Sequence, residues 1–425
     1  MSEFFKKFLT DYGYISILKI QILFELIVSI ILSSLAPFLF SQSNGFVTTR
    51  GKQIIAPDGK ELLLKGINIG NWLEPEGYMF KFEKAESSRK IYEVFNEIIG
   101  PDAAVKFWNE FRNNYITEND IKLIKDNGFN SIRVPFDYKL FTGIDFSSDC
   151  ARPGFKLLDN VINWCSKYKI YVILDMHCAP GGQTGANIDD SWGYPYLYEN
   201  VESQNLTIKI WKEIANRYKN EKYVLGYDLL NEPIAPYFDT EKLNTMLEPL
   251  YIKITKAIRT VDKNHLIILG GAQWDSNFNI FHKPFDSKLV YTFHVYWSDT
   301  TQSVIQKFID FRDKFNVPIW LGESGENTMQ WISSFRKLLE RNNIGWCFWT
   351  FKRLDTDRSI VSINQPDGYD KIIDYANTNR QTFEEIRKAL PNRDTVMKAS
   401  EEYLHNIKLK NCKVNEEYIK ALGIK

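Results

Sequence analysis

The sequence predicts an α/β fold, namely a closed (β/α)8 TIM barrel with an N-terminal β-hairpin and C-terminal helices packed on the barrel. Three observations lead to this prediction. Short apolar runs alternate with amphipathic segments, eight such runs occur, and polar residues gather where the runs end. Continuous apolar strands indicate a parallel sheet covered by helices. A dinucleotide-binding sheet has no local support, because no Gly-x-Gly-x-x-Gly follows the first strand.

The elements follow one another in a regular order. The hairpin is expected within 46–64, where Asp58-Gly59 separates apolar runs and predicts a tight turn. The eight strands are expected at 65–72, 130–135, 170–177, 223–227, 266–270, 289–294, 318–321 and 345–349. Helices are expected near 155–168, 206–218, 240–260, 303–315 and 329–341, and after the last strand at 368–377, 382–390 and 394–405.

One long helical stretch is expected between the first two strands. It closes with Thr117-Glu118-Asn119-Asp120, which has the pattern of a capping box, and Gly128 then marks a helix stop. No linker rich in Gly or Ser follows the eighth strand, so the C-terminal helices are expected to form the last layer of the barrel domain.

The N-terminus differs in composition from the rest of the chain. Residues 26–41 are apolar and uncharged, Lys19 precedes them, and small polar residues follow. This pattern is typical of a signal peptide and is short for a spanning helix. We therefore expect 1–42 to be a signal peptide and 43–425 to be one barrel domain. The protein would then be secreted or periplasmic; the alternative is an outward-facing anchor, with membrane contact only through 15–41.

Composition excludes several classes of protein. The formal net charge is +0, so the chain lacks the basic character of a nucleic-acid-binding protein. The five cysteines are widely spaced, with no Cys-x-x-Cys, so no zinc site is expected, and their odd number argues against a complete disulfide framework. The 62 aromatic residues (11 Trp, 22 Tyr and 29 Phe) supply a large core and also suit stacking on sugar rings.

Polar residues stand where the predicted strands end. In a barrel of this type the C-terminal ends of the strands converge on one face, and catalytic residues lie there. Each residue alone has a structural explanation, as an ion-pair partner or a core group, but their joint occurrence at strand ends favours a site. The set is Arg133, His177, Asn231, Glu232, His294, Tyr296, Glu323 and Trp349.

This set of residue types suits the hydrolysis of a glycosidic bond. That reaction uses two carboxyl groups, one protonated and one ionised, and Glu232 and Glu323 supply them. Asn231 can bond the sugar 2-hydroxyl, while Arg133 and Tyr296 can donate hydrogen bonds to Glu323. The two histidines, 177 and 294, can orient hydroxyls or tune Glu232, and the Trp at 349 offers an apolar floor for the sugar ring.

The motifs resemble those of glycoside hydrolase family five, the cellulase-like barrel enzymes. The resemblance covers about 60–351 and includes Arg133, His177, Asn231-Glu232, His294-Val295-Tyr296, Glu323 and Trp349. It implies a retaining double displacement with Glu232 as acid/base and Glu323 as nucleophile. The carboxyl groups should then lie about 5–5.5 Å apart. No metal or other cofactor is expected.

The loops around the predicted site indicate which substrate the site binds. The segments 66–74 and 177–185 resemble the exo-β-1,3-glucanase branch of that family, although Asn71 and Gly182 depart from its commoner pattern and the 187–200 loop is this sequence's own. The residues that can bond hydroxyls are Glu74, Glu76, Gln183, Asp189 and Asp190. The aromatic residues that can form subsites are Trp72, Tyr78, Trp192, Trp274 and Trp297.

A β-glucan with β-1,3 or β-1,4 linkages is therefore the expected substrate. Two alternatives stay open. The same chemistry can act on mannan or on a glucosylated lipid, and a protein of another class, a catalytically silent carbohydrate-binding barrel, would have the same fold. The silent barrel ranks low, because both glutamates and their partners are present.

Overall fold

The computed structural model describes residues 45–142 and 152–424. The chain divides into two compact units, residues 1–45 and Phe46–Lys425, and the second contains all the elements described below. The predicted leader, residues 1–42, lies outside the described residues. Within the described ranges no helix combines the length and the apolar character needed to cross a bilayer.

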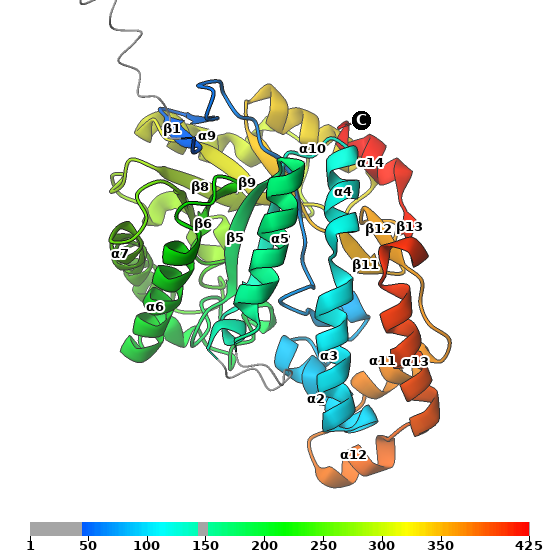
Figure 1. Ribbon diagram of the computed structural model, residues 1–425. Helices are drawn as coiled ribbons and strands as arrows, with labels where there is room; N and C mark the ends of the chain where they lie inside the picture. Colours follow the sequence, from blue (N-terminus) through cyan, green and yellow to red (C-terminus); the bar gives the residue numbers. More distant parts are fainter. Residues whose placement is uncertain (1–44, 143–151, 425) are drawn as a thin grey trace, which may run out of the picture. The chain divides into compact units, whose positions relative to one another are not determined.

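Eight parallel strands close into a barrel, which confirms the predicted fold class (Figure 1). Neighbouring strands follow the chain in order, and the barrel closes where the last strand pairs with the first. The strands are β3 (Lys65–Asn68), β4 (Ser131–Asp137), β5 (Tyr171–Cys178), β6 (Val224–Asp228), β7 (Leu266–Gly270), β8 (Leu289–His294), β9 (Ile319–Glu323) and β10 (Gly345–Phe348).

The N-terminal hairpin is shorter than the sequence predicts. Strand β1 (Thr48–Arg50) pairs antiparallel with β2 (Gln53–Ile55). The predicted third run, 62–64, forms no strand, and the residue before it, Glu61, forms only an isolated bridge with Ile55. Val47 and Ile54 of the hairpin pack against inward-facing barrel residues, so the hairpin seals that end of the barrel core.

Helices connect the strands, as expected. They are α5 (Gly154–Tyr168), α6 (Val201–Tyr218), α7 (Thr240–Arg259), the short α8 (Ala272–Asp275), α9 (Gln302–Phe315) and α10 (Met329–Arg341). The stretch after β3, predicted as one long helical region, contains α2 (Ser88–Ile99), α3 (Pro101–Tyr115) and α4 (Glu118–Asp126).

Local sequence explains these breaks between helices. Gly100 has a φ of +87°, and Pro101 follows at the first helical position, where its missing N–H costs nothing. Thr117 and Asp120 form the predicted capping box at the start of α4. The break at 100 therefore depends on a glycine and a proline, and the break at 117 on reciprocal capping hydrogen bonds.

The C-terminal region contains the three predicted helices, α11 (Tyr369–Ala376), α12 (Phe383–Ala389) and α13 (Arg393–Asn406). Helix α13 packs against α2, α3 and α11, so these helices extend the barrel domain (Figure 1). The sequence did not predict a small sheet of β11 (Lys352–Leu354), β12 (Val361–Ile363) and β13 (Lys413–Val414), nor α14 (Glu416–Leu422). Strands of two or three residues are too short to show a periodic pattern.

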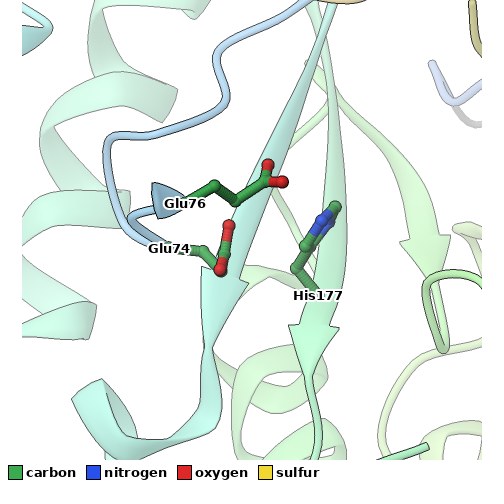
Figure 2. A group of neighbouring side chains, drawn as sticks. All are labelled: Glu74, Glu76 and His177. Atoms are coloured by element: carbon green, nitrogen blue, oxygen red, sulfur yellow. The ribbon is translucent and has the colours of Figure 1, made fainter. Parts of the chain in front are cut away.

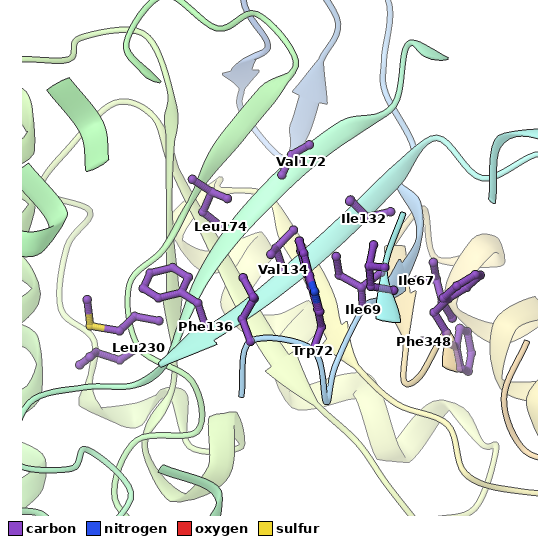
Figure 3. Packing of buried hydrophobic residues seen from close by; sticks show 14 of the residues in the cluster. Ile67, Ile69, Trp72, Ile132, Val134, Phe136, Val172, Leu174, Leu230 and Phe348 are labelled. Carbon is purple, nitrogen blue, oxygen red and sulfur yellow. The ribbon is translucent and has the colours of Figure 1, made fainter. Parts of the chain in front are cut away.

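The core has two layers because successive strand residues point to opposite faces. Outward-facing residues such as Ile132, Val134 and Leu174 pack under the helices (Figure 3). A second, smaller cluster fills the barrel interior and includes Ile173, Leu225, Leu266, Ile268, Val290 and Trp320. Each such side chain contributes roughly 1.5–3 kcal/mol when fully buried. Further along the same inward faces the residues become polar, and these positions build the site.

Candidate active site

A cavity of about 760 Å³ lies at the C-terminal ends of the strands. The loops after β3 and after β5 to β10 line it, as expected for a barrel of this type. Eight predicted site residues are among the lining groups: His177, Asn231, Glu232, Trp274, His294, Tyr296, Glu323 and Trp349. Three further candidate substrate contacts, Glu76, Tyr78 and Trp297, also line the cavity, as do Gln273 and Glu326, which the sequence did not predict.

Arg133 lies beneath the cavity and is completely buried. Its guanidinium donates to Asp228 at 2.9 Å and lies 3.1 Å from Asp175. It also donates to Glu323 and, at 2.9 Å, to Asn231 Oδ1. Arg133 therefore connects strands β4, β5, β6 and β9 and fixes one predicted catalytic carboxylate.

The charges around Arg133 compensate for its burial. Burial by itself would lower the pKa of the guanidinium, but Asp175 and Asp228 raise that pKa well above its usual value. In turn, burial raises the pKa of both Asp175 and Asp228 to about 7, although Arg133 opposes this rise. The floor of the site is thus a charge network that depends on one arginine.

Replacing Arg133 by methionine is expected to lower the free energy of unfolding by about 3–5 kcal/mol, because two buried carboxylates lose their partner. This loss of unfolding free energy should be smaller at pH 5 than at pH 8, since protonation of Asp175 and Asp228 removes the unpaired charges. Urea unfolding at both pH values measures it, with the exposed Arg387→Met as the matched control. An unchanged unfolding free energy would contradict this role.

His177 and Asn231 form the wall next to Arg133. His177 Nδ1 lies 2.8 Å from Asp175, and His177 Nε2 lies 3.2 Å from the Asn231 amide nitrogen. Burial lowers the pKa of His177 to about 4, so the imidazole is neutral near pH 7. Nδ1–H then donates to Asp175, and Nε2 accepts from the amide of Asn231. The Asn231 amide is in this way held at the cavity wall.

Glu232 follows β6 in a left-handed backbone conformation with a φ of +44°. Such a conformation costs of order 1–3 kcal/mol outside glycine and requires support from its surroundings. The Glu232 N–H donates to Asp275 at 3.2 Å, and the Thr184 hydroxyl donates to the Glu232 carbonyl at 2.8 Å. Burial raises the pKa of Glu232 to about 7. The residue is therefore held in place and retains its proton up to neutral pH.

His294 stands between the two glutamates. Its Nδ1 lies 2.9 Å from Glu232 Oε1 and 3.8 Å from Glu323 Oε2, while its Nε2 faces Asp275 at 3.3 Å. Burial lowers the pKa of His294 to about 3, so this imidazole is also neutral. A neutral ring can exchange a hydrogen bond with the protonated form of Glu232 without adding charge to the site.

Glu323 ends β9 and receives hydrogen bonds from two donors. Arg133 donates to one carboxylate oxygen, and the Tyr296 hydroxyl donates to the other at 3.1 Å. The two contacts fix the orientation of the Glu323 carboxylate. One oxygen each of Glu232 and Glu323 and one nitrogen of His294 lie within 4.8 Å of one another. The two glutamates thus face the same point in the cavity from different strands.

Trp349 forms the part of the cavity wall next to His177. Its ring is stacked with the His177 imidazole at 5.7 Å, and its indole N–H donates to the Tyr78 hydroxyl at 2.7 Å. The indole lies directly over Gly70, where any Cβ would come within 2.2 Å of the ring. A glycine at the tip of β3 therefore makes room for the indole.

Glu74 and Glu76 occupy different positions, although they stand two residues apart (Figure 2). Glu76 lines the cavity, whereas Glu74 is completely buried behind it and contacts Ser88. Burial raises the pKa of both carboxyl groups well above the usual value. Repulsion from Glu76 raises the pKa of Glu74 further, and repulsion from Glu323 raises that of Glu76. The expectation that Glu74 touches substrate is wrong in this structure, because Glu76 is the one of the two that lines the cavity.

Gln183 has a supporting position and does not line the cavity. Its side-chain amide donates to the carbonyls of His177 at 2.7 Å and Asn231 at 2.9 Å, and it accepts from the Ala179 N–H. All three contacts are to backbone, and Gln183 is completely buried. The expectation that Gln183 bonds a substrate hydroxyl is therefore wrong in this structure, and its contacts support the backbone of the site instead.

Comparison with known proteins agrees with this arrangement. Residues 93–355 match the family model described as cellulase (glycosyl hydrolase family 5). The chain belongs to glycosyl hydrolase family 5. It is therefore a glycoside hydrolase, and the resemblance seen in the motifs is confirmed.

Three proteins similar to this family 5 chain differ in the activities that their names give. The β-xylosidase of Phanerodontia chrysosporium is 32% identical over 238 residues, which are 56% of this chain and only 48% of that protein. Endoglucanase C of Acetivibrio thermocellus is 25% identical over 364 residues, 70% of this chain and 95% of the relative. Glucan 1,3-beta-glucosidase 2 of Wickerhamomyces anomalus is 26% identical over 333 residues, 75% of this chain and 73% of the relative.

Two groups in this family 5 site have the residue types of a metal centre. Glu74, Glu76 and His177 form one, and Glu232, His294 and Glu323 form the other. In both groups the imidazole nitrogens already face protein partners: His177 contacts Asp175 and Asn231, and His294 faces Glu232 and Asp275. A cation would have to displace these contacts, so the arrangement favours acid–base chemistry by the side chains themselves.

Sequence reasoning did not single out several residues of the site. Asp175 and Asp228 interrupt apolar strands on the inward face, and the two-residue spacing from Asp175 to His177 was a usable signal. Asp275 gave no such signal, since three consecutive residues (273–275) with positive φ values place it under Glu232. The loop geometry that brings it there is not encoded in a periodic pattern.

Proposed function

We propose that this protein is a retaining β-glycosidase in which Glu232 is the acid/base and Glu323 the nucleophile. One observation carries the proposal: carboxylate oxygens of the two residues lie within 4.8 Å of each other across one cavity. Retaining enzymes place their carboxyl groups about 5–5.5 Å apart, whereas inverting enzymes leave about 6.5–9.5 Å for a water molecule. The short separation supports a direct attack by Glu323.

The environments of the two residues support distinct roles. In the first step Glu323 attacks the anomeric carbon while Glu232 gives its proton to the departing glycosidic oxygen. In the second step Glu232 takes a proton from water, the water oxygen attacks the anomeric carbon, and the bond to Glu323 breaks. Glu232, with its pKa raised to about 7, can hold the required proton, and Arg133 and Tyr296 stabilise the departing Glu323 carboxylate.

We propose a β-linked glucan or glucoside as the substrate. The relatives include proteins named as a glucan 1,3-beta-glucosidase and an endoglucanase, and both names refer to glucan substrates. The segments 66–74 and 177–185 also resemble the exo-β-1,3-glucanase branch. Within the cavity, Asn231 lies beside the catalytic pair, and Glu76, His177 and Trp349 provide hydrogen-bonding groups and an apolar wall for one sugar ring.

Proton NMR of the first product tests the mechanism. The protein is incubated with β-1,3-glucan, β-1,4-glucan, mannan and an alkyl β-glucoside, and the anomeric signal is followed before mutarotation. We expect the β-anomer to appear first and a glucan to be the best substrate. Appearance of the α-anomer first would contradict the retaining mechanism. Faster turnover of mannan would contradict the proposed substrate class, and faster turnover of the alkyl glucoside would favour a small glucoside over a glucan.

A further inference from the structure

A continuous row of aromatic side chains leaves the catalytic cavity. It consists of Trp274, Tyr237, Phe238, Tyr194 and Tyr196, which we call the aromatic track. Successive ring centroids are 6.2, 4.7, 5.5 and 4.9 Å apart. Trp274 and Tyr237 line the cavity, whereas the other three rings lie outside it. The track therefore begins at the cavity wall and continues beyond it.

Three rings of the track are exposed, and the two that connect them, Phe238 and Tyr194, are half-buried. Tyr237 is 63% exposed, Tyr196 is 47% exposed and Trp274 is 40% exposed. Exposed large aromatic side chains that form a contiguous patch mark binding sites more often than isolated ones do. Since one end of this patch opens on the cavity, its ligand is most simply the distal part of the molecule that the cavity holds.

The backbone beneath the track is fixed by contacts between two loops. Ile234 donates to the carbonyl of Gln183 at 2.9 Å, and Ala235 donates to that of Thr184 at 3.0 Å. Phe238 lies over Gly185, whose φ is +84° and where a Cβ would come within 2.4 Å of the ring. A side chain at 185 would push the ring away, so the position needs glycine for both space and conformation.

The loop that carries Tyr194 and Tyr196 is also held at its base. Tyr196 donates through its N–H to the carbonyl of Gly181 at 3.1 Å, and Leu197 donates to that of Gly182 at 3.2 Å. The outer rings of the track are therefore anchored to the segment that follows β5. A surface held in this way can bind without first paying a large ordering cost.

Polar groups flank the track along its length. The Gln273 amide, which lines the cavity, donates to Asn244 at 2.8 Å and accepts from Asn277 at 2.8 Å. Glu199 interacts with Tyr194 and forms an ion pair with Lys242. Aromatic faces suit the C–H faces of sugars, and amides and charges suit their hydroxyls. Sugar hydroxyls can share hydrogen bonds with these polar groups, whereas an alkyl chain would gain nothing from them and would only desolvate them, so the mixture favours a sugar chain.

We infer that the aromatic track binds the part of a β-linked oligosaccharide that extends beyond the sugars next to the cleaved bond. The enzyme should then prefer chains of several units over disaccharides and aryl glycosides. This inference rests on the proposed function for its substrate class, but the surface itself is separate from the catalytic glutamates.

The test uses the outer rings, which lie outside the cavity. The double variant Tyr194→Ala/Tyr196→Ala is compared with the full-length wild type on an aryl β-glucoside and on β-glucan oligosaccharides from two to six units. We expect kcat/KM to fall about 5- to 30-fold on the longest chains and to be unchanged on the aryl glucoside and the disaccharide. The matched control is Phe383→Ala, which removes an 80% exposed ring on α12.

A series of alkyl glucosides of increasing chain length tests whether an alkyl chain occupies the track instead. Calorimetry separates this inference from the proposed function. Loss of activity on alkyl glucosides that grows with alkyl length, or an unchanged preference for long glucan chains, would overturn the inference. If the wild type hydrolyses no β-glucoside, the proposed function fails, and calorimetric titration of the wild type and the double variant with the hexasaccharide tests the track by itself. Binding that the double variant loses supports the track. Binding that the double variant keeps overturns it.

Discussion

The Glu323→Ala variant should lose hydrolysis of β-glucosides by a factor of about 10⁴ or more, in line with the removal of other catalytic nucleophiles. Glu323 is the carboxylate that Arg133 and Tyr296 hold within 4.8 Å of Glu232. Without it no covalent glycosyl–enzyme can form, whatever the leaving group. Initial rates on an aryl β-glucoside and on a glucan oligosaccharide measure the loss, and both should fall together.

Azide separates the loss of a nucleophile from a general defect in the site. In Glu323→Ala, azide can enter the space of the missing side chain and attack the anomeric carbon, which gives the α-glycosyl azide from a β-glycoside. The control is Glu326→Gln, which changes another cavity carboxylate, one that pairs with Arg353, and should lose less than tenfold. A β-glycosyl azide, or an equal loss in Glu326→Gln, would contradict the role of Glu323.

The Glu232→Gln variant should have an effect that depends on the leaving group. Loss of the proton donor should cost about 10²–10⁴-fold on an oligosaccharide, whose departing alkoxide needs a proton. The loss should be much smaller for the first step on an activated aryl glycoside, since that phenolate leaves unprotonated. Pre-steady-state release of the aryl group measures this step. An equal loss on both substrates would exclude Glu232 as the general acid.

The pH profile gives a second test of Glu232. Burial raises its pKa to about 7, so kcat/KM of the wild type should fall as the pH rises through that value and the proton is lost. Glu232→Gln should show no such fall on the aryl substrate. Both histidines of the site have pKa values lowered to about 4 and 3 by burial, so they do not account for a limb near neutrality.

The fold was predictable because its pattern repeats. Strands such as 266–270 and 289–294 coincide with the predicted ranges, since apolar runs buried on both faces differ sharply from the amphipathic helices between them. The β11–β12–β13 sheet was not predictable from the same signals. Its strands are only two or three residues long, and β13 comes from a segment about fifty residues after β12, so its pairing depends on how the C-terminal helices pack.

The site was predictable where a residue stands at the end of a strand. Glu232 and Glu323 come together in the cavity as expected, although their separate roles stay predictions until the variants are measured. The loop residues were harder to predict. Glu74 and Glu76 had equal claims in the sequence, and Trp192, proposed as a subsite, instead stacks with Arg89 at 3.6 Å and does not line the cavity.

The sequence by itself determined the barrel, the family-type motifs and the pair of carboxyl groups. The alternation of apolar strands with amphipathic helices is a local pattern, and a closed barrel brings all the C-terminal strand ends to one face. Only the tertiary structure decided which carboxyl is held by Arg133, which residue supports the Glu232 backbone, and where the aromatic track runs. These depend on distances between loops that are far apart in the chain. Burial, which sets the pKa of Glu232, is likewise a property of the packed molecule and of no single segment.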